Sequence, residues 1–137
     1  PEQRAAGEAN KKMRLGGTHG LSIPAGWRDR PGPLWLPEGA SNTLALTAAG
    51  LSAVGRPSNK AGVDVLIDLL RDLPADREVI VVGDNDRKPP TKQRTDGEWP
   101  GREGAEYTAG RLAAALGRPV RWTMPPPPAK DVRAWLT

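Results

Sequence analysis

Short apolar runs alternate with amphipathic segments over most of this 137-residue chain. The apolar runs have the length of buried strands, and we expect strands at 34–36, 51–54, 79–82 and 119–124. Apolar residues at three- and four-residue steps predict helices at 42–49, 62–73, 103–116 and 130–136. Strands that alternate with helices in this way predict an α/β fold, a mostly parallel sheet of about four strands with helices on both faces.

Residues 1–33 lack this regular alternation. Their first 20 residues are polar and helix-permissive, and residues 24–33 are rich in Pro and Gly. We therefore expect an N-terminal extension and loop over 1–33, followed by one domain over 34–137. Because the chain begins with Pro1 rather than Met, we expect it to be an excised or processed piece.

Three acidic residues follow two of the expected strands. Glu38 lies at the carboxyl end of the first strand, and Asp84 and Asp86 lie at the carboxyl end of the third. The carboxyl ends of parallel strands meet at one edge of the sheet, so these carboxylates are expected to converge and repel one another. A hard divalent cation such as Mg²⁺ would relieve the repulsion. The simpler interpretation is that Asp84 and Asp86 are ordinary turn residues, and the sequence leaves both open.

Composition narrows the classes of function and partner open to this chain. Lys and Arg number 20 against 16 Asp and Glu, a net charge of +4, which is compatible with a phosphate-bearing partner. The absence of Cys excludes disulfide scaffolds, zinc fingers and thiol catalysis, and His19 is the single His, expected in an exposed loop. No nucleotide-binding glycine motif of the G-x-x-x-x-G-K-[ST] or G-x-G-x-x-G type is present. With no signal peptide and no apolar run of ~20 residues, we expect a cytoplasmic protein without a membrane partner.

The five Trp residues divide into two groups. Trp35 and Trp135 fall on apolar patterns and are expected in the core, and Trp122 is expected to be half-buried on its strand. Trp27 and Trp99 lie in predicted loops, where they either pack against the domain or stack on a nucleic-acid base.

Four motifs in order carry a resemblance to a known family. Residues 36–39 read Leu-Pro-Glu-Gly before a helix, and residues 81–86 read Val-Val-Gly-Asp-Asn-Asp at the end of a strand. Residues 104–112 begin with Gly-Ala in a helix, and residues 128–136 read Pro-Ala-Lys-Asp-Val-Arg-Ala-Trp-Leu. Together they resemble the Toprim domain, in the form found in phage- and plasmid-type DNA primases and primase-helicases.

The resemblance implies metal-dependent nucleotidyl transfer, the synthesis of primers on single-stranded DNA from nucleoside triphosphates. It implies that Asp84 and Asp86 hold Mg²⁺ or Mn²⁺ and that Glu38 shares the metal or transfers a proton. Asp131 is implied as a further metal ligand. Neighbouring domains, such as a helicase or a zinc-binding domain, would belong to the parent protein, and the isolated domain can be inactive without them.

Basic residues near the expected site are candidates for contacts with nucleic acid or nucleotide. They are Arg56, Lys60, Arg87, Lys88 and Lys130. A solvated surface role is the simpler interpretation for each of them.

The chain departs from the family pattern at two places. Asn42 stands where many relatives have an acid, and residues 87–100 form a loop where primases have a tighter turn. A loop of this length is more often functional or mobile than idle.

Three other functions remain open. One is strand cleavage by a Toprim nuclease or topoisomerase, although Tyr107 lies inside a predicted helix and is a poor nucleophile candidate. Another is a non-catalytic module of the same fold that binds nucleic acid. A receiver-like domain would need a Lys after the last strand, and Lys130 fits poorly because it follows four prolines.

Overall fold

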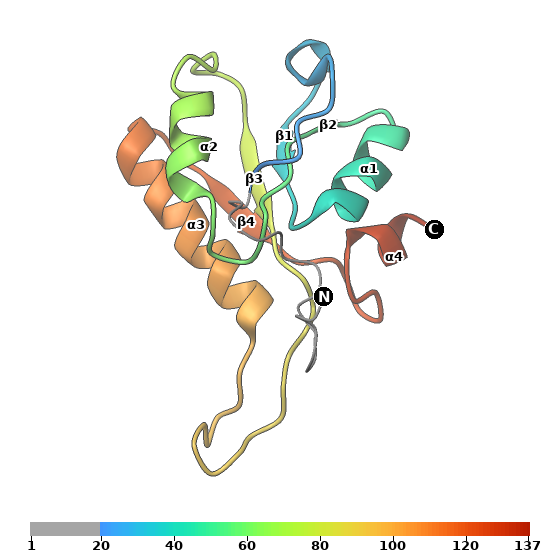
Figure 1. Ribbon diagram of the computed structural model, residues 1–137, viewed down its shortest axis with the longest axis vertical. Helices are drawn as coiled ribbons and strands as arrows, with labels where there is room; N and C mark the ends of the chain where they lie inside the picture. The colour runs from blue at the N-terminus through green and yellow to red at the C-terminus, as the bar shows by residue number, and fades with distance from the viewer. Residues whose placement is uncertain (1–19) are drawn as a thin grey trace, which may run out of the picture.

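The structure is a computed structural model that describes residues 20–137. The polar stretch 1–19, including His19, lies outside the described residues. Four strands form one sheet in the order β2-β1-β3-β4, and every pair is parallel (Figure 1). They are β1 (Leu34–Leu36), β2 (Ser52–Ala53), β3 (Val79–Val82) and β4 (Arg121–Thr123). The predicted α/β class and parallel sheet are thereby confirmed.

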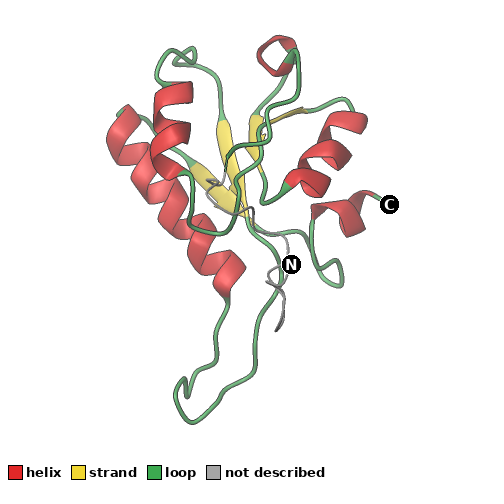
Figure 2. Cartoon of the chain, in the orientation of Figure 1, coloured by secondary structure: helices red, strands yellow, loops and turns green. Residues whose placement is uncertain are grey.

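Helices cover both faces of the sheet, as expected (Figure 2). They are α1 (Ala40–Ala48), α2 (Val63–Leu70), α3 (Pro100–Leu116) and α4 (Val132–Leu136). Helices α1 and α4 pack together on one face, and α2 and α3 pack together on the other. Helix α3 begins three residues earlier than the predicted start at residue 103. The reason is that Pro100, which needs no backbone donor, occupies its first turn.

The core follows the two-residue period of the strands. Leu34 and Leu36 of β1 are fully buried under α2 and α3, whereas Trp35 between them packs on the opposite side, under α1 and α4. Strand β3, the other central strand, is buried along its whole length, as its four consecutive apolar residues predict.

Residues 20–33 pack onto this domain. Trp27, within a single 3-10 turn at Trp27–Asp29, is buried in the larger core, and its carbonyl accepts a hydrogen bond from Ser52 Oγ at 2.6 Å. Ser22 pairs with Gly55 in an isolated antiparallel bridge, beside the edge strand β2. Through Trp27, the described part of the expected extension contributes to the same core.

The structure corrects one prediction about the Trp residues. Trp135 was expected in the core but is 47% exposed, because α4 is only five residues long and turns Val132 inward instead. Trp27 packs against the domain. Trp35 and Trp122 are half-buried and pack against the two core clusters.

The strand order reverses beside β1. The chain leaves β1 for β2 on one side and then crosses to β3 on the other, so the switch point lies between β1 and β3. In open parallel sheets, ligands bind beyond the carboxyl ends of the strands at such a point. Glu38 follows β1 and Asp84 follows β3, so both belong to this position.

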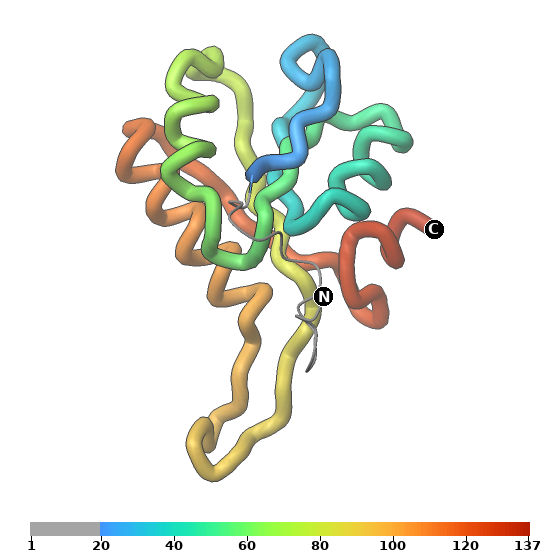
Figure 3. Tube along the Cα trace, viewed as in Figure 1, coloured from blue at the N-terminus to red at the C-terminus, as the bar shows by residue number. Residues whose placement is uncertain are grey.

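The long loop between β3 and α3 extends away from the rest of the domain (Figure 3). It contains no helix or strand, as predicted, but its two arms meet where Lys88 and Glu98 exchange backbone hydrogen bonds of 2.6 and 3.1 Å. Trp99 and Pro100 then lead directly into α3.

Candidate functional site

Glu38 and Asp84 lie beyond the ends of the two central strands. Both are half-buried. Glu38 is held by backbone pairing on either side, since Gly39 N donates to Arg56 O at 2.7 Å and Arg56 N donates to Pro37 O at 2.8 Å. This pairing extends the contact between β1 and β2 past the end of β1 and brings Arg56 beside Glu38.

Arg56 is the charged side chain behind the carboxylates, and it is only 1% exposed. Its Nε donates to Leu36 O at 3.1 Å, and its Nη2 donates to Val82 O at 2.6 Å. Its Nη1 donates to the carbonyls of Ser58 and Asn59. The expectation that Arg56 contacts nucleic acid is therefore wrong, because the guanidinium is enclosed and its donors are already bound to backbone.

The acids affect one another's pKa values. Burial, together with the negative charges of Glu38, Asp131 and Asp86, raises the pKa of Asp84 to about 7 against the opposing effect of Arg56. Burial also raises the pKa of Glu38; Arg56 lowers it and Asp86 raises it. Burial lowers the pKa of Arg56 to about 10 in spite of Glu38 and Asp84. The cluster has more negative charge than its one buried cation balances.

Two of the four acids accept hydrogen bonds of 2.8 Å from backbone amides. Asp86 Oδ1 accepts from Gly101 N at 2.8 Å, which joins the end of β3 to the first turn of α3. Asp131 Oδ1 accepts from Ala134 N at 2.8 Å and caps α4. Glu38 and Asp84 are consequently the carboxylates best placed to bind a ligand.

Two asparagines hold the site together, and neither was predicted to have a role there. Asn42 is buried; its Nδ2 donates to Glu38 O at 2.8 Å and more weakly to Asp84 Oδ1 at 3.5 Å. Its Oδ1 accepts from Arg133 N at 2.9 Å, which ties α1 to α4. The amide at position 42 thus acts as a connector, a role that needs both a donor and an acceptor.

Asn85 points away from the acids, toward the segment before α4. Its Nδ2 donates to the carbonyls of Pro125 and Ala129, and its backbone N donates to Lys130 O at 2.6 Å. Asp84 accepts a hydrogen bond from Asn42 of α1, whereas Asp86 accepts one from Gly101 of α3, so the two carboxylates bond to different helices. The Asp-Asn-Asp run was a signal for this role in the sequence, because an amide donor between two acids needs acceptors of its own.

The four remaining basic candidates are exposed. Lys60 lies over the Tyr107 ring at 5.4 Å, on the side of α3, and Arg87 lies over Trp99 at 5.7 Å. Lys88 belongs to the long loop, and Lys130 follows the proline segment beside Asn85. Arg87 and Lys130 are the two that lie together, because both line one cavity.

The donor set fits a hard cation only in part. Carboxylate oxygens are the ligands that Mg²⁺ prefers, and the pKa of Asp84 is raised by burial and then by the neighbouring negative charges. Within residues 20–137, however, no three His, Cys, Asp or Glu side chains are grouped so that they could hold a metal ion. The arrangement suits a cation held by two protein carboxylates with water and a substrate phosphate, and it does not form a cage made of protein alone.

The raised pKa of Asp84 predicts a pH-dependent stability. Its folded pKa of about 7 lies above the unfolded value of 3.8, so the folded state holds this proton more tightly, and stability falls as pH rises from about 4 through 7. We expect Asp84→Asn to be more stable than wild type at pH 8 by about 1 kcal/mol, or ~4 °C in Tm, with solvent screening of this half-buried group allowed for.

Thermal unfolding in EDTA at pH 4, 6 and 8 measures this difference. The stability gap should be smallest at pH 4 and reach its full size above pH 7. Glu106→Gln, at an exposed carboxyl on α3, is the control and should show no such trend. A gap that is the same at all three pH values would contradict the assignment to Asp84.

Comparison with known proteins identifies no relative of this chain. No protein-family model matches the chain, and no curated protein or solved structure matches it significantly. Across residues 20–137, no helix is both long and apolar enough to cross a membrane. The resemblance to Toprim domains therefore rests on the four sequence motifs.

Proposed function

We propose that this chain is the Toprim-type catalytic domain of a DNA primase-like protein. Its reaction would be divalent-metal-dependent nucleotidyl transfer, the synthesis of short primers on single-stranded DNA. The observation that carries the proposal is the position of Glu38 and Asp84 at the switch point of the parallel sheet, with the pKa of Asp84 raised to about 7.

The chain's own residues would divide the work. Asp84 and Glu38 would hold Mg²⁺ or Mn²⁺, with Asp86 beside them, and Asp131 would add negative charge at the edge of the site. A bound divalent cation would polarise the phosphate oxygens and neutralise the charge that develops during transfer. Arg56 limits the repulsion between the acids from behind, and Asn42 orients Asp84.

The half-buried state of Glu38 suits a second role. With its pKa raised by burial, this carboxyl can take up a proton nearer neutral pH than an exposed Glu. It can therefore accept the proton of the attacking hydroxyl when the metal is held mainly by Asp84.

The test compares metal binding with activity in the same variants. Asp84→Asn should weaken Mn²⁺ binding at least ~10-fold in calorimetry and reduce primer synthesis from ribonucleotides by at least ~100-fold, since the metal neutralises the transferring phosphate. The assay uses a single-stranded template with the full chain. Asp96→Asn, an exposed acid in the long loop, is the matched control and should behave as wild type.

Other outcomes would reject the proposal in different ways. Nicking of a plasmid without nucleotides, lost in Asp84→Asn, would assign the site to strand cleavage. No detectable Mn²⁺ binding at millimolar concentration would exclude the catalytic role.

A non-catalytic module that binds nucleic acid is the second candidate. It is favoured by the absence, among residues 20–137, of a preformed group of three metal-ligating side chains. For that function, binding to single-stranded DNA would be unchanged by EDTA and by Asp84→Asn.

A further inference from the structure

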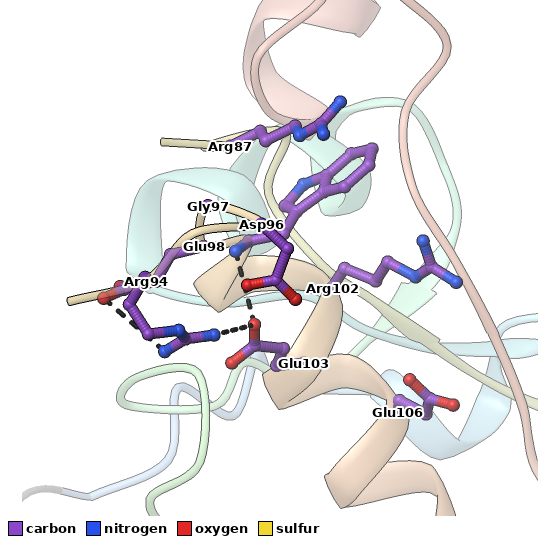
Figure 4. A pocket seen from close by; sticks show the side chains of 9 residues that line it. Arg87, Arg94, Asp96, Gly97, Glu98, Arg102, Glu103 and Glu106 are labelled. Carbon is purple, nitrogen blue, oxygen red and sulfur yellow. Dashed lines mark hydrogen bonds and ion pairs between the residues drawn. The ribbon is translucent and has the colours of Figure 1, made fainter. Parts of the chain in front are cut away.

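Trp99 lies between two cavities at the base of the long loop. One, of about 360 Å³, is lined by residues of the loop and of the first turns of α3 (Figure 4). The other, of about 400 Å³, lies between the loop base and the proline segment before α4 and is lined by Asn85, Arg87, Trp99, Pro127, Pro128 and Lys130, with Ala129. Both volumes lie in the range of small-molecule sites.

The two cavities differ in charge. The first is lined by four carboxylates and three guanidinium groups, and Arg94 is already paired with Glu98 at 3.6 Å and Glu103 at 3.4 Å (Figure 4). The second is lined by two cations, Arg87 and Lys130, and by no acid of the described chain. A phosphate would be repelled from the first and attracted to the second.

The walls of the second cavity are held in place from both sides. Arg102 lies 5.7 Å from the Trp99 ring and 5.6 Å from the Trp122 ring, so it links Trp99 to β4. On the opposite side, Asn85 binds the backbone of the proline segment through the carbonyls of Pro125 and Ala129. An indole and two proline rings thus form an apolar slot of defined position.

The indole has one buried polar group. Within residues 20–137, no atom accepts a hydrogen bond from the N–H at Nε1 of Trp99. A buried N–H of this kind is costly unless something accepts from it. A phosphate oxygen at the edge of the ring could act as that acceptor, whereas a base stacked on the ring face cannot reach an in-plane N–H.

We propose that this cavity binds a nucleotide, with its base against Trp99 and the two prolines and its phosphate on Arg87 and Lys130. The choice of ligand rests on the proposed function. The site is next to the acids in the chain, because Asn85 lies between Asp84 and Asp86 and Lys130 precedes Asp131. The nucleotide is either a free nucleoside triphosphate or one residue of single-stranded DNA, and both present the same chemistry.

Binding is measured in EDTA, so that the metal site does not contribute. Wild type and variants are titrated with ATP in one arm and with a dT oligonucleotide in the other. Trp99→Leu should weaken binding of the true ligand roughly 5- to 100-fold, the loss expected from one base–aromatic stack. The arm in which this loss occurs identifies the source of the nucleotide.

A second variant leaves the indole in place. Arg87→Gln with Lys130→Gln should weaken binding and, in the DNA arm, reduce the slope of log K against log salt by about 0.7 for each phosphate that the protein no longer neutralises. The controls are Trp135→Leu on exposed α4 and Lys92→Gln in the loop, neither of which lines the two cavities, and both should bind as wild type.

The outcomes separate this proposal from the proposed function. No binding of either ligand by wild type, or equal binding by wild type, Trp99→Leu and the double variant, would overturn the nucleotide site. Trp99-dependent binding together with an absence of Mn²⁺ binding would uphold the nucleotide site and reject the catalytic function. Metal-dependent primer synthesis that is unchanged in Trp99→Leu and in the double variant would uphold the catalytic function and reject the nucleotide site.

Discussion

Arg56→Met will destabilise the fold by about 3–5 kcal/mol, a large part of the stability of a domain this size. The buried guanidinium supplies donors to Leu36 O at 3.1 Å, Asn59 O at 2.8 Å and Val82 O at 2.6 Å. Without it, Leu36 O and Val82 O lose this donor and Asn59 O keeps only the longer bond from Thr108 Oγ1 at 3.4 Å; each buried group left unpaired costs about 1–3 kcal/mol. Urea unfolding followed by Trp fluorescence measures the loss.

Two further variants separate geometry from charge. Arg56→Lys keeps the charge but replaces a planar fork with a compact ammonium that cannot reach carbonyls on three segments, so it should recover less than half of the loss. Arg71→Met removes an exposed Arg that pairs with Asp68 at 3.5 Å, and it should change stability by no more than about 0.5 kcal/mol. A cost below about 1 kcal/mol for Arg56→Met would show that the guanidinium does not support the strand ends.

The fold could be predicted because its signals are local. Each strand is a short apolar run and each helix has its own periodicity, so element order and parallel pairing follow from general rules. The exact ends of the strands could not be predicted from these rules. The run 51–54 yields a strand of only two residues, Ser52–Ala53, because its partner β1 has just three residues to pair with on that side. Trp135 was misplaced because a five-residue helix buries only one side chain, and Val132 occupies that position.

The acids of the site could also be predicted, since strand ends and sheet topology determine where they lie. Arg56 could not, because Arg is almost never fully buried and nothing in a single sequence distinguishes this one from an exposed neighbour. Its burial depends on carbonyls at the ends of β1 and β3, which come together only in the folded sheet. The cavity beside Trp99 likewise joins residues 85–99 with residues 127–130, and that contact is long-range.

The contact between β3 and α3 leads to the second large prediction. Gly101→Ala will destabilise the protein by about 3 kcal/mol, because an ideal Cβ on Gly101 would lie 2.1 Å from Asp84 O. The neighbouring atom is backbone and cannot rotate away, so either α3 or the end of β3 must shift. Gly83 lies against the same turn, where an added Cβ would be 2.2 Å from Gly101 O. The shift would also break the bond from Gly101 N to Asp86 Oδ1 and displace Asp84, so Mn²⁺ binding should weaken along with stability.

Gly110→Ala is the matched control, since it makes the same chemical change on the same helix. Gly110 has nothing within 4 Å of its would-be Cβ, and it is exposed. Alanine favours an exposed helix interior over glycine by about 0.5–1 kcal/mol, so this variant should be more stable than wild type. Opposite signs for the two substitutions in urea unfolding would locate the close approach at the first turn of α3. Equal effects would mean that α3 tolerates a methyl group beside Asp84, and the acids would then not depend on glycine at this position.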